Sequence, residues 1–297
     1  MGIGMAASTR DNLLMASKCS VALDKQGVLT VRRAMTDIGI SSYTVVTQVA
    51  AEMLGRPISQ VRMELGDSDL PQTHGSGGSC GAASPGSGLF DAFTNLAGQA
   101  GVIAANATFA GGRAGGRVAG GGRSSKLGLE ASGEIKPGSM TKKYSQQGCG
   151  AHCAEVAVDR DTGEIRPRRL LGVFAADRSL NQKIANSEAV GAMIWDIGWA
   201  LHENALVPSR YGYFVNHDRA EYHVFAHANI PAIEAHFLQE VDDKSNPVKI
   251  KGGGELRNCG AGAALANAAY NACGVWIREF LMPLDKMLAG LDRQKMT

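Results

Sequence analysis

Apolar and polar residues alternate along several short segments of the chain. Two such segments, 19–24 and 28–32, are separated by Lys25-Gln26-Gly27, a sequence typical of a tight turn. Alternation with a period of two indicates a β-strand with one buried face, and a glycine turn between two strands indicates a β-hairpin. A second hairpin is predicted on the same grounds at 152–158 and 165–173.

Other segments place apolar residues at the spacing of an α-helix. In 43–54 these residues recur every three or four positions, and Gly55 is the kind of residue at which helices end. The segment 189–202 is apolar on most sides, which predicts a buried helix. The segment 260–270 has the composition of a helix made of small residues.

Shorter strand signals complete the pattern. The residues 58–65 favour a strand, and Val248 and Ile250 indicate the end of another, just before a glycine-rich loop. Strands and helices follow one another without the regular strand–helix–strand rhythm of a parallel α/β fold. The sequence therefore predicts an α+β fold with mixed sheets and packed helices.

The composition is that of an ordinary soluble protein with one unusual feature. The 297 residues are 44% apolar and 20% charged, and no stretch is apolar over the roughly 18 residues that a membrane span requires. The net charge of +2 gives no global nucleic-acid footprint. The 38 glycines are near double the usual share of ~7% and gather at 75–88, 111–122 and 252–254, which suits a backbone wrapped around a large ligand.

Two patterns have both a functional and a structural interpretation. The run 111–126 holds arginines among glycines, as nucleic-acid arms do, but it lacks interleaved aromatic residues, so a surface loop is favoured. The six cysteines include no Cys-x-x-Cys pair, which disfavours a structural zinc site or an iron–sulfur cluster held by this chain alone. Cys149, His152 and Cys153 have the residue types of a metal site, but packing in a strand is the preferred interpretation.

Four loops carry residues suited to a bound anion. The segment 39–44 opens a predicted helix with hydroxyl and free N–H groups, and 75–79 is a loop of glycine and serine. The segment 178–184 precedes the buried helix and offers two cations and side-chain amides. In 251–255, three glycines deliver Glu255 to the start of a small-residue helix. Together the loops indicate a large, phosphate-bearing cofactor held by backbone groups.

Glu255 considered by itself allows two interpretations. A carboxylate fixed between the glycines and a helix N-terminus is well placed to act as a base, and partial burial would raise its pKa toward neutral pH. A flexible loop with an exposed glutamate explains the same residues equally well.

A series of motifs occurs along the chain in a characteristic order. These motifs are Thr36-Asp-Ile-Gly39, Gly66-Asp-x-Asp-x-Pro71, Gly75-Ser-Gly-Gly-Ser79, Gly150-Ala-His152, Ala200-Leu-His-Glu203 and Lys251-Gly-x-Gly-Glu255. In this order they resemble the molybdenum-binding large subunit of the xanthine oxidase family, in particular bacterial periplasmic-type aldehyde oxidoreductases with separate subunits. The resemblance runs over nearly the whole chain, and the glycine–glutamate loop is its most specific part.

The resemblance implies the fold of the molybdenum-cofactor-binding domain of xanthine oxidase and aldehyde oxidase. It implies a molybdopterin cofactor in the cytosine dinucleotide form, whose molybdenum is held by the pterin dithiolene and by no protein side chain. It also implies oxidation of aldehydes to carboxylic acids with water as the oxygen source, with Glu255 as the general base. A 2Fe-2S subunit and an FAD subunit are implied as partners, whereas nucleic acid and a membrane are not.

The cofactor-binding positions implied by the resemblance lie in the same four loops and at one further position. They are Gly39, Ile40 and Ser41; Gly78 and Ser79; Arg178, Ser179, Leu180, Asn181, Gln182, Lys183 and Ile184; Glu188; and Lys251, Gly252, Gly253 and Gly254.

Several residues depart from the pattern of the resembled family. A carboxylate at Glu188 that faces a pyrophosphate would weaken its binding unless Arg178 or Lys183 offsets the charge. If Arg257 points at Glu255, it lowers the pKa of that carboxylate and weakens it as a base. The departures are Asp177 and Asp196 in place of glycine, Cys80 in place of tryptophan, Glu188 in place of glutamine, Phe225 in place of proline, Gly253 in place of a small apolar residue, and Arg257 in place of a small residue.

The large subunit of the resembled family is more than twice as long as this chain. The resemblance therefore implies its C-terminal portion without the N-terminal cofactor domain, with two α+β subdomains at about 1–140 and 141–297. The start of the chain has no export signal, so a cytoplasmic location is expected, or a periplasmic one that depends on a partner's signal. The alternative function is that of a catalytically inactive remnant that serves only as a partner-binding module.

Overall fold

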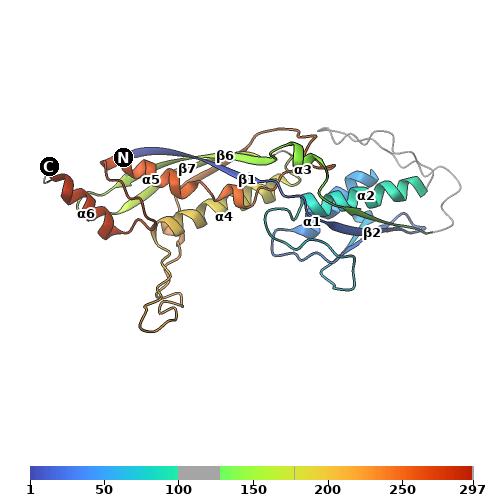
Figure 1. Ribbon diagram of the computed structural model, residues 1–297, viewed down its shortest axis with the longest axis horizontal. Helices are drawn as coiled ribbons and strands as arrows, with labels where there is room; N and C mark the ends of the chain where they lie inside the picture. Colours follow the sequence, from blue (N-terminus) through green and yellow to red (C-terminus); the bar gives the residue numbers. More distant parts are fainter. Residues whose placement is uncertain (100–127, 177, 296–297) are drawn as a thin grey trace.

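A computed structural model of the protein describes residues 1–99, 128–176 and 178–295. The described chain is elongated, with one sheet toward each end (Figure 1). Each sheet contains both antiparallel and parallel strand pairs, which confirms the predicted α+β fold with mixed sheets. The arginine–glycine run 111–126 and Asp177 lie outside the described residues.

The first sheet has the strand order β1-β6-β7-β8. β1, β6 and β7 pair antiparallel, whereas β8 pairs parallel with β7. The hairpin formed by β6 and β7 is the one predicted from the alternation in the middle of the chain. The strands are β1 (Gly2–Asp11), β6 (Gln147–Val158), β7 (Ile165–Ala175) and β8 (Ala232–Phe237).

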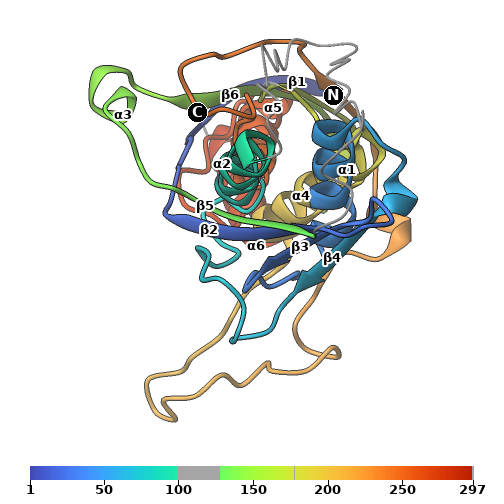
Figure 2. The same ribbon diagram turned by 90° about the vertical axis from the view of Figure 1, so that its right-hand side faces the viewer.

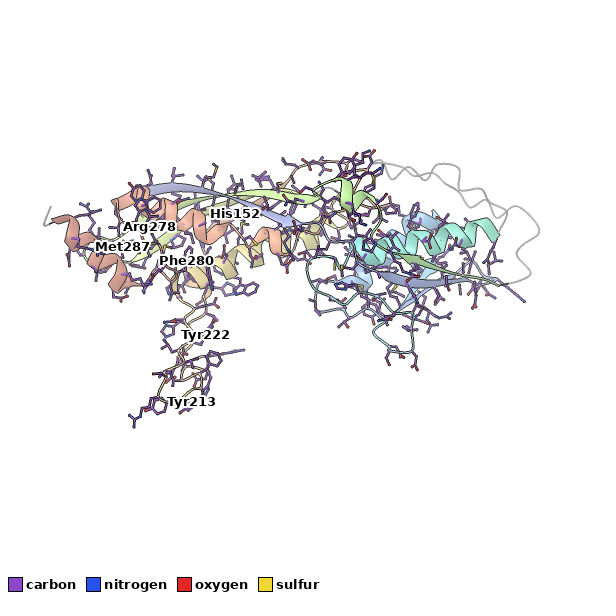
Figure 3. All side chains as sticks on the ribbon, in the orientation of Figure 1. His152, Tyr213, Tyr222, Arg278, Phe280 and Met287 are labelled. Atoms are coloured by element: carbon purple, nitrogen blue, oxygen red, sulfur yellow. The ribbon has the colours of Figure 1, made fainter. Side chains whose placement is uncertain are left out.

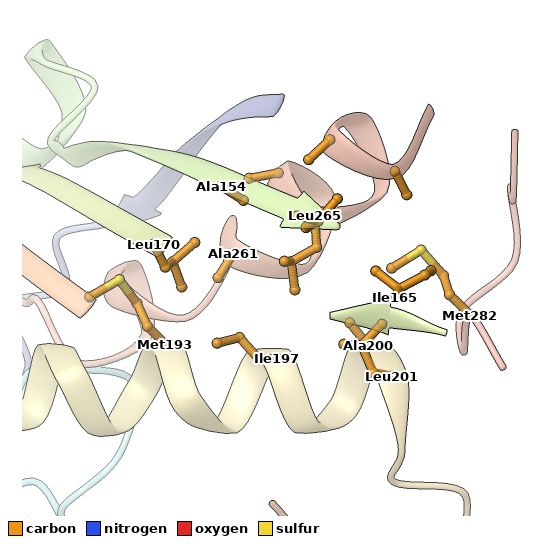
Figure 4. Close-up of a cluster of buried hydrophobic side chains, with 14 of the residues drawn as sticks. Ala154, Ile165, Leu170, Met193, Ile197, Ala200, Leu201, Ala261, Leu265 and Met282 are labelled. Carbon is orange, nitrogen blue, oxygen red and sulfur yellow. The ribbon is translucent and has the colours of Figure 1, made fainter. Parts of the chain in front are cut away.

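Two helices, α4 (Gln182–Leu201) and α5 (Ala261–Cys273), pack against this sheet, and α6 (Leu284–Lys295) follows near the end of the chain. The backbones of α5 and β1 lie in close contact, because a Cβ on Gly4 would lie only 2.2 Å from the backbone N of Ala268. An apolar core fills the space between the helices and the strands (Figure 4). Its members include Ala154, Leu170, Met193, Ile197, Ala261 and Leu265.

The second sheet has the strand order β4-β3-β2-β5. β2 and β3 form the other predicted hairpin, and β4 pairs parallel with β3. Helices α1 (Ser42–Leu54) and α2 (Ala83–Gln99) pack on this sheet (Figure 2). The core between them includes Val21, Val46 and Leu89. The strands are β2 (Ser17–Leu23), β3 (Leu29–Arg33), β4 (Val61–Leu65) and β5 (Leu129–Ile135).

Short elements and loops complete the chain. The segment 203–231 projects from the body as a long arm that carries Tyr213 and Tyr222 (Figure 3). In the described part of the chain, the helices are too short or too polar to cross a membrane. The short elements are α3 (Met140–Lys143) and the 3-10 turns η1 (Ile58–Gln60), η2 (His227–Asn229) and η3 (Glu255–Arg257).

The structure differs from the sequence analysis in the glycine-rich segment 75–88. Its second half is not a loop but the start of α2, where small residues allow close packing against the sheet. A Cβ on Gly88 would lie 2.7 Å from the backbone O of Ser17 in β2. Glycine in this helix therefore reflects helix–strand contact, which outweighs its low helix propensity. The sequence analysis also did not predict β1, β5, β8 and α6.

Several predicted boundaries change as well. Helix α4 begins earlier than predicted, because Asn181 Oδ1 accepts a hydrogen bond from the N–H of Ile184 at 3.1 Å and caps the helix. The strand predicted at 58–65 is reduced to β4, since η1 precedes it. Ile250 is an isolated bridge residue after a turn and not the end of a strand. The division into subdomains at about residue 140 stays a prediction, although β1 pairs with β6 of the second half.

Candidate functional site

A cavity of about 320 Å³ lies where loops from the two halves of the chain meet. Its wall is formed by the loop before α1, the glycine–serine loop, the loop before α4 and the segment around η3. These are the four loops that the sequence analysis selected. The predicted residues that line the cavity are Ile40, Gly78, Ser79, Arg178, Ser179, Leu180, Asn181, Ile184, Glu188, Lys251, Gly253, Gly254 and Glu255.

Gly252 is buried behind the wall and joins two of the loops. Its N–H donates to Asn12 Oδ1 at 3.1 Å. A Cβ on Gly252 would lie 2.3 Å from the backbone O of Ser79, so the two loops pass in direct backbone contact. Only glycine permits this approach.

Four other predicted positions lie outside the lining. Gly39 and Ser41 shape the turn before α1, with φ of 99° and 60°, in the left-handed region that non-glycine residues rarely adopt. Gln182 and Lys183 are exposed on the first turn of α4. The structure therefore brings most of the predicted positions to one cavity but leaves these four at its margin.

Glu255 lies in η3 beside the cavity. Its Oε2 accepts a hydrogen bond from Ser79 Oγ at 2.9 Å and one from Arg10 Nε at 2.5 Å. The N–H of Glu255 donates to Ser79 Oγ at 3.0 Å. Ser79 has a φ of 57°, a strained conformation of the kind that clusters at functional sites. The Glu255 side chain is 48% exposed and remains accessible from solvent.

The electrostatics of Glu255 correct the sequence analysis. The hydrogen bond and charge of Arg10 lower the pKa of the Glu255 carboxyl below its ordinary value, and the hydrogen bond from Ser79 acts in the same direction. Burial opposes this shift but is the smaller effect. The expectation that partial burial raises the pKa was therefore wrong, because it left out a cation from another part of the chain.

Arg10 is the residue of this site that the sequence analysis missed. It lies near the end of β1, which pairs with β6 and runs past the turn that carries Glu255. The alternation of small or polar residues with Ile3 and Met5 in this segment was the available signal for a strand. Nothing local in this segment shows that its far end meets the turn at Glu255, 245 positions along the chain.

Arg257 points away from Glu255. Its Nη1 lies 2.8 Å from Glu188 Oε2, and its guanidinium stacks over the ring of Phe237 with 5.3 Å to the centroid. The condition for Arg257 to lower the pKa of Glu255 is therefore not met, and the cation that contacts Glu255 is Arg10. Arg257 is also the counter-ion of Glu188, while Arg178 pairs with Glu52 of α1.

His152 of β6 supports the η3 turn through a hydrogen bond to its backbone. The buried His152 Nε2–H donates to the backbone O of Arg257 at 2.9 Å, and its ring meets Phe174 edge-on. Burial lowers the pKa of His152, which favours the neutral ring. Within the described residues, no group of three or more His, Cys, Asp or Glu side chains is arranged to hold a metal ion. The contacts with Phe174 and with the backbone of Arg257 give His152 a packing role, which is the interpretation that the sequence analysis preferred.

Asp196 connects α4 to the start of α5. Its Oδ2 accepts a hydrogen bond from the N–H of Gly262 at 2.6 Å. Gly260, the N-cap residue of α5, has no side chain to satisfy this end of the helix. Burial raises the pKa of Asp196, although the backbone N–H groups oppose the shift. Asp196 therefore fixes the helix that follows the Glu255 turn.

The donors around the cavity fit a polar, anionic ligand. The hydroxyl groups of Ser42 and Ser179 are buried in its wall and have no hydrogen-bond partner within the described residues. The first turns of α1 and α4 border the same cavity, and helix N-termini attract negative charge. Buried polar groups normally have partners, and a ligand with acceptor atoms in this cavity would lie beside these two hydroxyls.

The model of the molybdopterin cofactor-binding domain family matches residues 1–231. The chain is 45% identical over 302 residues to the aldehyde oxidoreductase molybdenum-binding subunit PaoC of Escherichia coli K12, a match that covers 98% of this chain and 41% of PaoC. It is 28% identical to the probable hypoxanthine oxidase XdhD of the same organism, over 93% of this chain and 30% of XdhD. The chain thus spans about two fifths or less of the length of these relatives.

Solved structures share the fold. The aldehyde oxidoreductase of Desulfovibrio desulfuricans superposes with a TM-score of 0.80 at 19% identity, over 97% of this chain and 32% of that one. Quinoline 2-oxidoreductase of Pseudomonas putida superposes with a TM-score of 0.78 at 19% identity, over 98% of this chain and 42% of that one. At this identity the likeness concerns the arrangement of the backbone.

Proposed function

Because the chain belongs to the molybdopterin cofactor-binding domain family, we propose that it binds molybdopterin in the cavity beside Glu255. The activity that we propose for the assembled enzyme is oxidation of an aldehyde to a carboxylic acid with water as the oxygen source. The similarity to PaoC supports this substrate class, since PaoC is the molybdenum-binding subunit of an aldehyde oxidoreductase.

The observation that carries the proposal is the coincidence of unsatisfied donors with an acceptor side chain in one cavity. Ser42 and Ser179 offer buried hydroxyls, the first turns of two helices offer positive dipole ends, and Glu255 offers a carboxylate. The backbone of 251–254 and the 78–79 turn would approach a planar ligand without side chains in the way. When bound, the cofactor supplies the two-electron oxidation, and the chain supplies binding and proton transfer.

In this proposal Glu255 accepts a proton during the reaction. Its Oε2 is held by Ser79 and Arg10, whereas Oε1 has no hydrogen-bond partner within the described residues and is the oxygen available to the proton. Arg10 stabilises the ionised carboxylate, so the base is deprotonated over a wide range of pH. Ser79 and the η3 turn orient the carboxylate toward the cavity.

The finer parts of the proposal concern the form of the cofactor and the partners. We propose the cytosine dinucleotide form, a 2Fe-2S subunit and an FAD subunit. An assembly of several subunits is supported by two relatives that are themselves subunits, PaoC and the gamma subunit of the 6-hydroxypseudooxynicotine dehydrogenase complex. The cytoplasm or the periplasm stays the expected compartment.

The test is to purify the chain together with the partners that copurify with it, and to measure its metal and nucleotide. We expect about one molybdenum per chain by inductively coupled plasma mass spectrometry, and cytosine nucleotide after acid release. PaoC expressed under the same conditions is the positive control. A metal-free chain beside a loaded PaoC would contradict the proposal.

A second candidate is a catalytically inactive module that only binds partners. The contact between Arg10 and Glu255 favours it, because an arginine that lowers the pKa of a carboxylate also makes that carboxylate a weaker base. Metal content with aldehyde turnover supports the enzyme, whereas partner binding without metal supports the inactive module.

A further inference from the structure

Three departures from the resembled family's pattern form one cluster in the cavity wall. Arg257 lies between Glu188 of α4 and Gly253, and its side chain is only 9% exposed. Its Nη1 lies 2.8 Å from Glu188 Oε2. A Cβ on Gly253 would lie 2.8 Å from Nη2 and 3.1 Å from Cζ of Arg257. The guanidinium therefore occupies the space that a side chain at position 253 would need.

The cluster places an ion pair where the cavity meets its ligand. Glu188, Gly253 and Arg257 all line the cavity, and the Glu188 side chain is 35% exposed. An unpaired carboxylate in this wall would repel a phosphate group at short range and low dielectric. A buried arginine beside it cancels that charge, whereas loss of either partner leaves an uncompensated charge.

We infer that Arg257 neutralises the Glu188 carboxylate so that the cavity accepts an anionic ligand, and that Gly253 makes room for the guanidinium. The three residues act as one unit that determines which charge the ligand meets at this wall. The inference rests on the proposed function, because it takes the ligand to be a phosphate-bearing molybdopterin. Within this unit Arg257 is a positioning residue and does not take part in proton transfer.

This electrostatic role differs from a merely structural one in a measurable way. If the ion pair served only to hold α4 against η3, Glu188→Gln and Arg257→Ala would weaken the protein to similar extents. If it neutralises the wall, the two changes have unequal effects on ligand content. Glu188→Gln keeps a hydrogen-bond acceptor for Arg257 and leaves the wall more positive, whereas Arg257→Ala leaves a bare carboxylate.

The experiment compares the wild type, Glu188→Gln, Arg257→Ala and the double variant in the complex purified with its partners. Molybdenum and released cytosine nucleotide per chain are measured, together with the melting temperature. Arg257→Ala is expected to lower both contents roughly tenfold, because it leaves the Glu188 carboxylate unpaired in the wall that meets the anionic ligand. Glu188→Gln is expected to lower the content much less than Arg257→Ala does, and the double variant recovers to within about twofold of Glu188→Gln.

A matched pair on the surface controls for the general effect of removing an ion pair. Arg166 and Glu164 form such a contact at 2.9 Å; neither residue lines the cavity, and both side chains are well exposed. Glu164→Gln and Arg166→Ala are expected to leave the molybdenum content unchanged. Exposed pairs contribute little to stability, so these variants also set the baseline for the melting temperature.

Gly253→Ala keeps the inference testable if Arg257→Ala does not fold. Its Cβ would lie 2.8 Å from Nη2 of Arg257, so the guanidinium has to shift relative to Glu188, and the variant is expected to lower the molybdenum content. Adding Glu188→Gln to it is expected to restore that content. The inference is overturned if the double variants stay as low as Arg257→Ala and Gly253→Ala, or if Glu188→Gln alone falls as far. A wild-type chain without molybdenum overturns the proposed function first, which separates the two failures.

Discussion

Glu255 shares one carboxylate oxygen between Ser79 and Arg10 and leaves the other open. Both partners stabilise the ionised form, so the residue combines a fixed position with a lowered pKa. A weaker base is deprotonated in a larger fraction of molecules, and catalysis balances these two effects. The position of the carboxylate is thus a property of three segments that meet and not of its own loop.

The pH dependence of turnover tests this arrangement. Because Arg10 lowers the pKa of Glu255, Arg10→Ala is expected to raise that pKa and move the acidic limb of the kcat/KM profile to higher pH. The profile is measured on complexes matched for molybdenum content. An unchanged acidic limb would mean that Arg10 does not hold Glu255 in the loaded enzyme.

Removal of the base is a separate test. Glu255→Gln keeps the size and hydrogen-bonding capacity of the side chain but cannot accept the proton. We expect aldehyde turnover to fall by roughly 10²–10⁴-fold while molybdenum content stays at the wild-type level. Wild-type turnover in this variant would remove Glu255 from the role of general base.

At the scale of elements, α4 holds the site through contacts at two points along its length. Glu188 faces the cavity and pairs with Arg257, while Asp196, two turns further along, binds the start of α5. The η3 turn and α5 therefore both contact α4. His152 of β6 also holds η3, by a hydrogen bond to the backbone O of Arg257. The turn that carries Glu255 has fixed contacts to three elements.

The contact of Asp196 with α5 predicts a pH-dependent contribution to stability. Burial raises the pKa of Asp196 above its ordinary value of 3.8, so its favourable contribution is complete below that value and is lost as pH rises through the raised pKa. Asp196→Asn should flatten the dependence of melting temperature on pH in that interval. Asp196→Ala should cost about 1 kcal/mol at low pH, because the N–H of Gly262 loses its acceptor, and less as pH rises through the raised pKa, because the burial of a charged carboxylate is then relieved. Equal pH dependence in the wild type and in Asp196→Asn would contradict this assignment.

At the scale of the whole molecule, β1 connects the start of the chain to the site. It pairs along its length with β6, lies against α5, and ends beside Glu255 with Arg10. The close approach of β1 to α5 depends on Gly2 and Gly4, which have no room for a side chain. Packing at one end of β1 is thus linked to electrostatics at the other.

Gly4→Ala tests the close packing of β1 against α5. A Cβ at Gly4 would lie 2.2 Å from the backbone N of Ala268, so we expect the variant to lose about 1–3 kcal/mol of unfolding free energy in urea. The matched control is Gly138→Ala, where a Cβ would meet no atom within 4 Å. Equal stability of the two variants would show that β1 and α5 separate readily in solution.

The sequence by itself determined the two hairpins, the helix α1 and the four loops of the site. These features are local: alternation, helical spacing, terminal glycines and runs of small residues act on neighbouring positions. The glycines inside α2 and at the start of β1 give no local signal of their role, because each of them permits close contact with another element. Local patterns cannot distinguish a glycine that ends a helix from one that packs it.

Only the tertiary structure decided the electrostatics of the site. The sequence indicated a role for Glu255 and marked Glu188 and Arg257 as unusual residues. It did not show that Glu188 and Arg257 form an ion pair. Arg10 and Glu255 are 245 positions apart, and a charge acts through distance in space, which the order of residues does not give. The local sequence pattern thus located the Glu255 carboxylate. The packing of β1 against β6 and α5 brings Arg10 to that carboxylate, and Arg10 lowers its pKa.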